Sequence, residues 1–390
     1  SNGLEKRPKL RFPGFDEPWK VFKAEELFQN ITDKNHPDET VLTIIQGKGT
    51  LPRDQAGRNI HYDDASLSYY KKVEQGDFII HLRSFEGGLE MANEAGIVSP
   101  AYTILRCKRP HSSLFYDAYF HTDEFINHNL SKSVEGIRDG RQISYEAFKW
   151  LGIPYCEPTE QEKISNLFAA LNERIAKQRD LVESLKKYKR GVMRAIFRDK
   201  SFVFSKATVW KSIRFGDECV FFSGGTPKST DSSYYGGSIP FIRSGEIHGE
   251  KTELFLTEAG LQNSSAKMVS KGDLLIALYG ATSGEVDISK IDGAINQAIL
   301  CIRPYDMSKQ YLRYLLEDSK DDIINTYLQG GQGNLSAEII KNLRVDIPDS
   351  TAQSSVVEFL SMIERRIEMS IAECEQIQAM KRSLIQQLFI

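Results

Sequence analysis

The sequence predicts an α+β fold, in which two mixed, strand-rich modules are separated by two long antiparallel coiled-coil helices as a pseudo-two-fold internal repeat. Three observations predict this fold. The chain has 390 residues, which is more than a single hydrophobic core usually organises. Its second half repeats parts of the first half at a constant offset. The best-matched segments carry apolar residues at alternating spacings of four and three, which is typical of paired helices.

The internal repeat is clearest over a long stretch that needs no gap. At an offset of 192 positions it matches Gln161 with Gln353, Phe197 with Phe389, Lys149 with Lys341, Ile164 with Val356, and Lys189 with Lys381. A weaker match upstream relates residues 73–80 to residues 269–276 at an offset of 196, and Trp19 and Trp210 open the two copies. The Gly-Asp pairs at 76–77 and 272–273 within this match predict turns that launch strands. A period this long indicates duplicated domains rather than a solenoid.

The two modules show the pattern of short buried strands. Residues 239–242 and 273–279 are apolar runs bounded by glycines and turn residues, which favours strands over helices. We expect the following domain boundaries along the chain: first module 1–153, central helix 154–198, second module 199–347, distal helix 348–390.

Two segments predict long helices. Thr159 and Glu162 fit a capping box at the start of the first helix, and no proline or glycine follows until Gly191. The apolar seam of this helix is expected at Ile164, Phe168, Leu171, Ile175, Val182 and Leu185, with Gln178 as a polar interruption. The second helix repeats the seam at Val356, Leu360, Ile363, Ile367, Ile371 and Ile377. Because a narrow helix needs a partner to cover its seam, we expect the two to pack antiparallel on one another.

Composition excludes several classes of protein. The chain is 41% hydrophobic and 26% charged, and no apolar run approaches the ~18 residues of a membrane span. Its five cysteines are at least 49 positions apart, which excludes a disulfide framework and predicts free thiols in a reducing cytoplasm. The net charge of −3, from 50 basic and 53 acidic residues, does not by itself indicate a nucleic-acid binder.

Catalytic motifs are scarce. The sequence contains no phosphate-binding GxxxxGK[ST] loop, no HExxH pair and no Asn-Pro-Pro-Tyr or Asp-Pro-Pro-Tyr tetrapeptide. Asp318 and Lys320 have the Asp-x-Lys spacing of a nuclease metal site, but one such tripeptide is expected by chance and it falls in a predicted helix. The seven histidines are better explained as surface or hydrogen-bonded residues than as ligands. We therefore predict no catalytic residue, no metal site and no cofactor.

Loops of both modules carry side chains that can read DNA. Base edges are recognised by Arg, Lys, Asn, Gln, Ser and Thr, and phosphates by cations and backbone amides, which glycines let approach closely. The candidates in the first module are Lys48, Arg53, Arg58, Arg83, Ser84, Arg138 and Arg141. In the second module they are Thr226, Lys228, Ser229, Arg243, Ser244, Gln332 and Asn334. Any single one of these residues could instead be an ordinary solvated loop residue, so the prediction rests on the set.

Local motifs point to a family. Residues 99–102 (Ser-Pro-Ala-Tyr) follow Gly87-Gly88, residues 279–284 (Tyr-Gly-Ala-Thr-Ser-Gly) precede Asn-Gln-Ala at 296–298, and residues 333–336 (Gly-Asn-Leu-Ser) lead into the second helix. With the alternation of variable modules and repeated helices, this pattern resembles the specificity subunit of type I restriction–modification systems over nearly the whole chain.

That resemblance implies a non-catalytic subunit that binds double-stranded DNA. Each module would be a target-recognition domain for one half of a bipartite, asymmetric site, and the helices would space the modules and dock partners. The implied partners are two methyltransferase subunits and, in the full complex, two restriction subunits, with no membrane involved. Two alternatives remain open: a coiled-coil scaffold that does not read DNA, and a fused nuclease or methyltransferase, against which the missing motifs argue.

Overall fold

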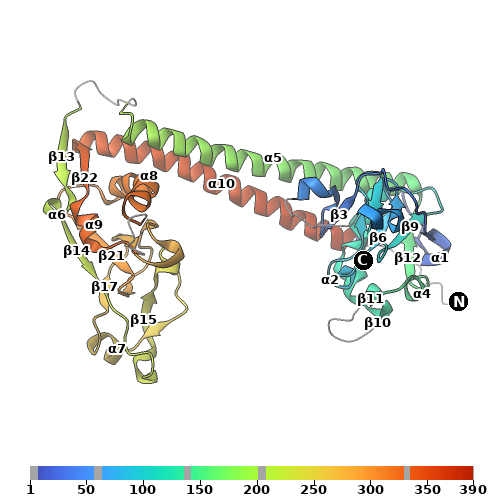
Figure 1. Ribbon diagram of the computed structural model, residues 1–390, viewed down its shortest axis with the longest axis horizontal. Coiled ribbons are helices and arrows are strands. Elements are labelled where there is room, and N and C mark those ends of the chain that lie inside the picture. The colour runs from blue at the N-terminus through green and yellow to red at the C-terminus, as the bar shows by residue number, and fades with distance from the viewer. Residues whose placement is uncertain (1–7, 57–63, 136–141, 201–207, 329–333, 390) are drawn as a thin grey trace. The chain divides into compact units, whose positions relative to one another are not determined.

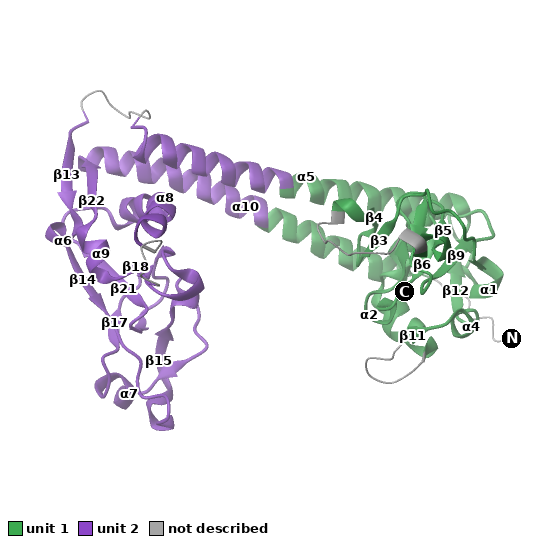
Figure 2. Cartoon of the chain, in the orientation of Figure 1, with its two compact units in different colours: residues 1–179, 372–390 green, residues 180–371 purple. Residues whose placement is uncertain are grey.

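The computed structural model describes residues 8–56, 64–135, 142–200, 208–328 and 334–389 (Figure 1). It divides into two compact units (Figure 2). Unit 1 comprises residues 1–179 and 372–390, and unit 2 comprises residues 180–371. Each unit therefore contains one module and one half of each of the two long helices, α5 (Pro158–Phe197) and α10 (Ser350–Phe389).

The predicted antiparallel pairing of these helices is confirmed within each unit. In unit 1 the ring of Phe168 stacks on that of Phe389 at 6.2 Å, and Arg174 pairs with Glu373 at 3.0 Å. In unit 2 Lys189 pairs with Glu364 at 2.7 Å. As residue numbers rise along α5, the numbers of the partners in α10 fall, which is the signature of antiparallel helices.

Two details of the helices differ from the prediction. Helix α5 begins at Pro158, so Thr159 lies inside its first turn and is not the N-cap; proline suits the first helical position because its missing N–H has no partner there anyway. In α10 the seam passes through Ser370 and Cys374, both buried, whereas Ile371 is 37% exposed. Keeping the alternation of three and four between Ile367 and Ile377 requires positions 370 and 374, even though position 371 holds the more apolar residue.

Each long helix ends in the core of a module, which explains the repeated phenylalanine. Phe389 is fully buried in unit 1, where its ring contacts those of Trp19, Phe115 and Tyr119 at 6.1, 5.2 and 5.7 Å. Phe197 is half-buried in unit 2 and contacts the ring of Tyr311 at 5.5 Å.

The elements of unit 1 form a mixed α/β module ahead of α5. In chain order they are β1 (Lys20–Lys23), α1 (Ala24–Leu27), β2 (Phe28–Ile31), β3 (Leu42–Ile45), β4 (Gly49–Pro52), β5 (Lys71–Val73), β6 (Phe78–Ile80), α2 (Ser84–Gly87), β7 (Glu90–Met91), β8 (Gly96–Val98), β9 (Thr103–Cys107), α3 (Ser113–Phe120), β10 (Val134–Glu135), β11 (Gln142–Ile143), α4 (Tyr145–Phe148) and β12 (Gly152–Tyr155).

The module of unit 2 lies between the two long helices in the chain. Its elements are β13 (Trp210–Arg214), α6 (Phe215–Glu218), β14 (Cys219–Ser223), β15 (Tyr235–Ile242), β16 (Phe255–Leu256), α7 (Glu258–Gln262), β17 (Lys267–Val269), β18 (Leu274–Ala277), β19 (Val286–Ile288), β20 (Gly293–Ile295), β21 (Ile299–Pro304), α8 (Lys309–Leu328), α9 (Ala337–Asn342) and β22 (Arg344–Pro348).

Both modules are built on the same antiparallel four-stranded sheet. Its strand order is β2-β9-β6-β7 in unit 1 and β14-β21-β18-β19 in unit 2. A two-stranded pairing accompanies it in each unit, β1 with β12 and β13 with β22. Unit 2 adds a second four-stranded sheet, β16-β15-β20-β17, whereas the corresponding part of unit 1 holds the β3–β4 hairpin and the β5–β8 pair. The repeated sheet confirms the predicted α+β class and internal repeat.

Buried polar residues of the repeat hold the helix starts in place. The Gln161 side chain accepts a hydrogen bond from the Ser112 amide at 3.0 Å and donates one to the Cys156 carbonyl at 2.8 Å. Gln353 does the same with the Ser308 amide at 3.0 Å and the Pro348 carbonyl at 2.9 Å. Since an unpaired buried amide is costly, this pair of hydrogen bonds explains why glutamine recurs at both positions.

The repeated Gly-Asp pairs launch the central strands, as the sequence suggests. Gly76 and Gly272 have φ of 88° and 92°, a conformation that favours glycine. The carboxylate that follows binds an arginine of the neighbouring strand, Asp77 to Arg106 and Asp273 to Arg303. Burial would raise the pKa of Asp273, but hydrogen bonds from Arg303 and Lys309 outweigh burial and lower it.

Two further expectations concern the chain as a whole. All five cysteines are free thiols, four of them buried and Cys107 half-buried. Among the described helices, none combines the length and the apolar character that a membrane crossing requires.

Candidate nucleic-acid interface

Lys48 lies at the tip of the β3–β4 hairpin. The turn closes through a hydrogen bond from the Lys48 amide to the Ile45 carbonyl at 2.9 Å, and Gly47 and Gly49 on either side have φ of 73° and 78°. The Lys48 side chain is exposed, and it forms no ion pair with any residue that the structure describes. It is therefore available to an external anion.

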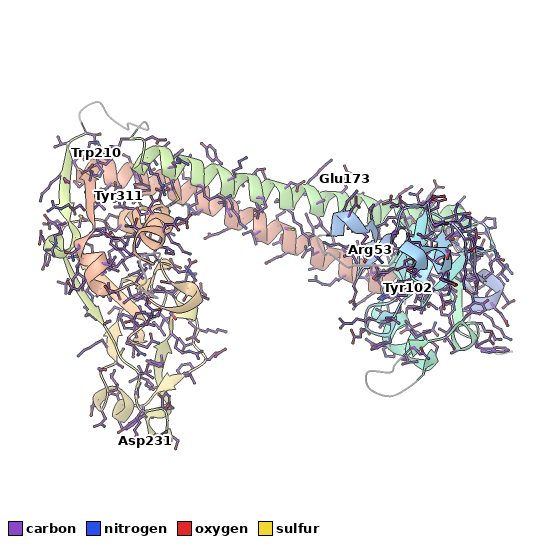
Figure 3. The ribbon with its side chains drawn as sticks, in the orientation of Figure 1. Arg53, Tyr102, Glu173, Trp210, Asp231 and Tyr311 are labelled. Carbon is purple, nitrogen blue, oxygen red and sulfur yellow. The ribbon has the colours of Figure 1, made fainter. Side chains whose placement is uncertain are left out.

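Three other candidates of the first module have partners within it. The Arg53 guanidinium lies over the Tyr70 ring at 6.0 Å; Arg53 is labelled in Figure 3. Arg83 is 68% exposed and pairs with Glu86 at 2.6 Å. Ser84 is completely buried, and its hydroxyl accepts a hydrogen bond from the His81 amide at 2.9 Å. The expectation for Ser84 is thus corrected: its hydroxyl stabilises the start of α2 and does not face solvent.

Four candidates cannot be placed. Arg58, Arg138 and Arg141 of the first module and Gln332 of the second lie outside the described residues.

In unit 2 the loop after β14 carries three candidates. Thr226 donates a hydrogen bond from its hydroxyl to the Gln297 side chain at 2.7 Å. Lys228 and Ser229 are exposed, and their side chains have no partner among the described residues. The loop ends near Asp231, which lies at the end of unit 2 far from Trp210 and Tyr311 (Figure 3). Lys228 is the cation of this loop that an external anion can reach.

The glycines of this loop have a structural cause. A Cβ at Gly224 would lie 1.8 Å from the Ile295 carbonyl oxygen, and one at Gly225 would lie 1.9 Å from the Ser265 hydroxyl. Glycine is required there for the loop to pack against its own module. The expected role of bringing backbone amides to phosphates is not needed to explain these two positions.

Arg243 is held by two carboxylates. Its guanidinium contacts Glu246 at 3.1 Å and Glu253 at 2.5 Å, and these hydrogen bonds raise its pKa. Its side chain is 37% exposed, and the neighbouring Ser244 is half-buried. Asn334, the last candidate, is exposed. A base or phosphate that approached Arg243 would have to compete with both glutamates.

Sequence patterns missed two carboxylates at matching positions of the two sheets. Glu90 of β7 is paired in register with Ile79, and Asp287 of β19 with Leu275. Glu90 binds His121 at 3.3 Å, and Asp287 binds His248 at 2.8 Å. The offset of 196 between Ile79 and Leu275 was visible in the sequence, but the acids differ in type and spacing, so the match emerges only from strand register.

The electrostatics of these pairs favour charged partners. Burial lowers the pKa of His121, but its hydrogen bond to Glu90 and the charge of Asp117 raise it overall. Burial likewise opposes ionisation of Glu90, and the bond from His121 together with two backbone amides lowers its pKa. For His248, the hydrogen bond to Asp287 is the main cause of a raised pKa.

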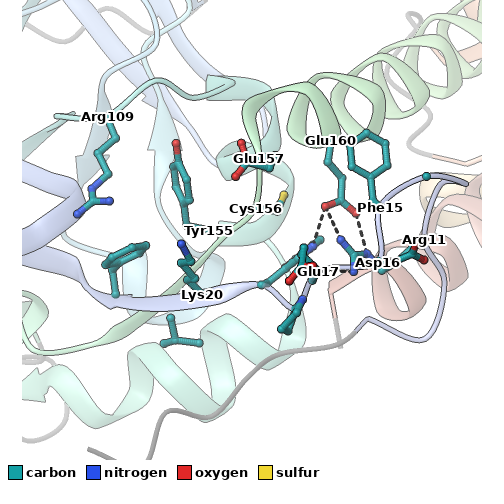
Figure 4. A pocket seen from close by; sticks show the side chains of 15 residues that line it. Arg11, Phe15, Asp16, Glu17, Lys20, Arg109, Tyr155, Cys156, Glu157 and Glu160 are labelled. Atoms are coloured by element: carbon teal, nitrogen blue, oxygen red, sulfur yellow. Dashed lines mark hydrogen bonds and ion pairs between the residues drawn. The ribbon is translucent and has the colours of Figure 1, made fainter.

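A groove of about 910 Å³ in unit 1 carries no catalytic constellation among its described residues (Figure 4). Glu160 accepts hydrogen bonds from Arg11 at 2.8 Å and from the Trp19 indole at 3.0 Å. Burial raises the pKa of the Cys156 thiol, which keeps it protonated and a poor nucleophile. The groove lies where residues 11–22 pack beside the start of α5.

No group of three or more His, Cys, Asp or Glu side chains in the described part of the chain could hold a metal ion. Asp318 and Lys320 lie in α8 and pair with Arg198 at 2.8 Å and Glu285 at 2.5 Å. These pairings give the Asp-x-Lys tripeptide an ordinary structural explanation.

Comparisons with known proteins agree with the fold. Residues 208–379 match the family model described as "Type I restriction modification DNA specificity domain". The type I restriction enzyme MjaVIII specificity subunit of Methanocaldococcus jannaschii is 22% identical, over 96% of this chain and 92% of that protein. The putative type I restriction enzyme MjaX specificity subunit of the same organism is 24% identical over 62% of this chain, and the match spans 59% of that relative.

Solved structures share the architecture. One chain, from a study of complex assembly and conformational transition of the type I R-M system, has a TM-score of 0.65 and 16% identity, covering 97% of this chain and 99% of that one. The type I restriction–modification S subunit from M. genitalium has a TM-score of 0.57 and 15% identity, with 99% of both chains covered. The matched domain and the curated relatives, together with the internal repeat, support a type I restriction–modification specificity subunit, and the solved structures share its fold.

Proposed function

We propose that this chain is the DNA-reading subunit of a type I restriction–modification complex, and that each module reads one half of a bipartite, asymmetric site in double-stranded DNA. The observation that carries the proposal is the same four-stranded sheet in both units, combined with unlike loops. Two half-sites of different sequence call for similar scaffolds and different contact surfaces. The recognition domains would be residues 1–153 and 199–347, and the helical regions 154–198 and 348–390.

The helices are proposed to space the modules and to dock two methyltransferase subunits, with two restriction subunits joining in the full complex. In this arrangement the partners carry out methyl transfer and cleavage in the cytoplasm, and this chain performs no chemistry. The net charge of −3 supports a DNA-binding surface that is shared with the methyltransferase subunits. A chain with few spare cations gains little binding energy from phosphate contacts alone.

A module exchange tests half-site reading. The methylome of cells that express this chain with its methyltransferase subunits gives both half-sites and the gap between them. We expect a chimera with residues 210–347 from another specificity subunit to change one half-site only. A change in both half-sites would contradict independent reading, and specific methylation that is unaffected by the exchange would favour the scaffold alternative.

A matched insertion tests the spacer role. One heptad after Arg179 and one after Ile371 keep both seams in register and lengthen the helix pair by roughly 10.5 Å. Since duplex DNA rises ~3.4 Å per base pair, the gap should grow by about three base pairs. An unchanged gap in an active variant would show that the helices do not set it.

A further inference from the structure

The turn that carries Lys48 is held from both sides by groups that lie far away in the sequence. One oxygen of the Glu90 carboxylate accepts a hydrogen bond from the Gly47 amide at 2.7 Å, and the other accepts one from the Gly49 amide at 2.9 Å. On the opposite side, the Asn93 side-chain amide donates to the carbonyls of Lys48 and Thr50 at 2.7 and 2.9 Å. These two side chains therefore bind two amides and two carbonyls of the turn.

The shape that these bonds fix is one that the chain would not adopt by default. Both glycines have positive φ, and a Cβ at Gly49 would lie 2.5 Å from the Met91 carbonyl oxygen. A free turn with two glycines samples many conformations, so ordering it carries a cost in backbone entropy. The carboxylate provides the bonds that offset this cost.

Glu90 is an unusual residue to find at this place. Its side chain has no exposed surface, and a buried carboxylate is costly unless its oxygens are all engaged. Besides the two amides it binds His121 at 3.3 Å, and His121 in turn contacts the Asp117 carbonyl oxygen at 2.8 Å. An ionised carboxylate can accept all three bonds at once, which an amide or hydroxyl cannot.

The second module supports a purpose beyond stability. Asp287 occupies the matching register position and binds His248, which follows the segment of Arg243 and Ser244. The two histidines come from different parts of their modules, yet the carboxylate stands at the same strand position. In each unit it connects the central sheet to a segment that bears candidate DNA contacts.

We propose that Glu90 is a positioning residue of the first recognition domain, which holds the Lys48 turn in the shape that brings the Lys48 ammonium to a DNA phosphate. This proposal rests on the proposed function. Phosphate is the expected partner because lysine acts as a point charge, and because phosphate contacts set the register of a protein on the duplex. Glu90 itself does not touch DNA in this scheme.

A double-mutant cycle tests the proposal in the complete complex with methyltransferase subunits. The variants are Glu90→Gln, Lys48→Ala and the combination of both, with Glu94→Gln as the matched control. Glu94 is an exposed acid of the same module, so the control removes the same charge without touching the turn. The substrates are duplexes that carry the site found by methylome sequencing, and each variant is measured for KM, kcat and Tm.

Glu90→Gln is expected to raise KM for DNA about ten-fold with kcat unchanged, because one amide of the turn then faces the NH₂ of glutamine. Lys48→Ala should raise KM to a similar extent, and the combined variant should be no worse than the worse single variant. Additive losses, or a Glu90→Gln variant that equals Glu94→Gln, would overturn the proposal.

If Glu90→Gln does not fold, Asn93→Ala replaces it in the cycle. It removes the bonds to the carbonyls of the turn without leaving a buried charge unpaired. A rise in KM of about three-fold that disappears in the Lys48→Ala background supports positioning, and an equal rise in both backgrounds overturns it. Absence of sequence-specific methylation by the unaltered complex would instead refute the proposed function. Failure of the positioning proposal and failure of the proposed function can therefore be told apart.

Discussion

Unit 1 and unit 2 have the same central sheet, but they join the long helices to it in different ways. In unit 1 the end of α10 enters an aromatic cluster, with Phe389 against Trp19, Phe115 and Tyr119. Unit 2 has Phe197 against Tyr311 at the equivalent helix end, and it adds an ionic junction where α5, α8 and α10 meet. Glu364 accepts bonds from Lys189 and Arg313 at 2.7 and 2.6 Å and from the Tyr314 hydroxyl at 2.6 Å.

The loops differ in a parallel way. Unit 1 uses a buried carboxylate to hold the backbone of a turn, and the Lys48 side chain stays unpaired among the described residues. At Arg243 of unit 2 the carboxylates of Glu246 and Glu253 bind the side chain itself, whereas the Lys228 side chain of the same unit is unpaired among the described residues. Exposure and residue type therefore do not separate these candidates, whereas neutralisation of the charge within the module does.

The largest expected effect is at the helix ends. Phe389→Ala should lower the free energy of unfolding by about 3–5 kcal/mol, the range for a fully buried phenylalanine. Phe197→Ala should cost about 0.5–3 kcal/mol, because its ring is half-buried and, among the described residues, has one ring partner, Tyr311. Denaturant unfolding of the full chain measures both. Equal losses would show that the two helix ends are packed equally well.

The ionic junction should respond to acid. Burial opposes ionisation of Glu364, but hydrogen bonds and charge from Arg313 lower its pKa in the folded chain. Its contribution is therefore present above the unfolded carboxyl pKa of about 4.3 and is lost as pH falls through the folded pKa. Glu364→Gln should cost about 1.5–3 kcal/mol at neutral pH, and less in acid.

Asn172 stands 192 positions before Glu364, so unit 1 has no acid at the matching place. Glu373→Gln serves as the control, since Glu373 is an exposed helix acid that pairs with Arg174. An equal loss of stability from Glu364→Gln at neutral and acidic pH would contradict the conclusion that the ionised Glu364 carboxylate stabilises unit 2.

Substitutions of the candidate loop cations should differ in their effect on DNA affinity. Lys48→Ala and Lys228→Ala should each weaken binding of all sequences alike and lower the salt slope by about one. Arg243→Ala should have a smaller effect, because releasing its guanidinium from two carboxylates costs energy that DNA contacts must offset. Binding of the complex across a salt series measures both quantities. A larger loss from Arg243→Ala would show that DNA displaces the glutamates.

The smallest expected effect is the pH dependence of the Glu90–His121 pair. The folded pKa of His121 is raised, so its contribution to stability is fully present below the unfolded histidine pKa of about 6.5 and is lost as pH rises through the folded pKa. His121→Gln should therefore destabilise the chain more at about pH 6 than at about pH 9. Unfolding at both values checks the sign, and a penalty that grows with pH would refute it.

Sequence by itself determined the repeat, the antiparallel helices, the strand-launching Gly-Asp turns and the resemblance to type I specificity subunits. These features follow from short-range periodicity or from matched residues such as Gln161 and Gln353, whose partners are fixed by the same local geometry in both copies. Tertiary structure decided which loop residues remain available. It buried Ser84, neutralised Arg243, moved Ile371 out of the seam and assigned Gly224 to internal packing.

Glu90 marks the boundary between the two kinds of information. Nothing near it in the sequence indicates that its carboxylate binds Gly47, 43 positions earlier, or His121, 31 positions later. Hydrogen bonds between distant segments depend on how the strands are brought together, and a single sequence carries no periodic trace of them. The residues that shape the Lys48 turn are therefore found only when the fold places its backbone against a buried partner.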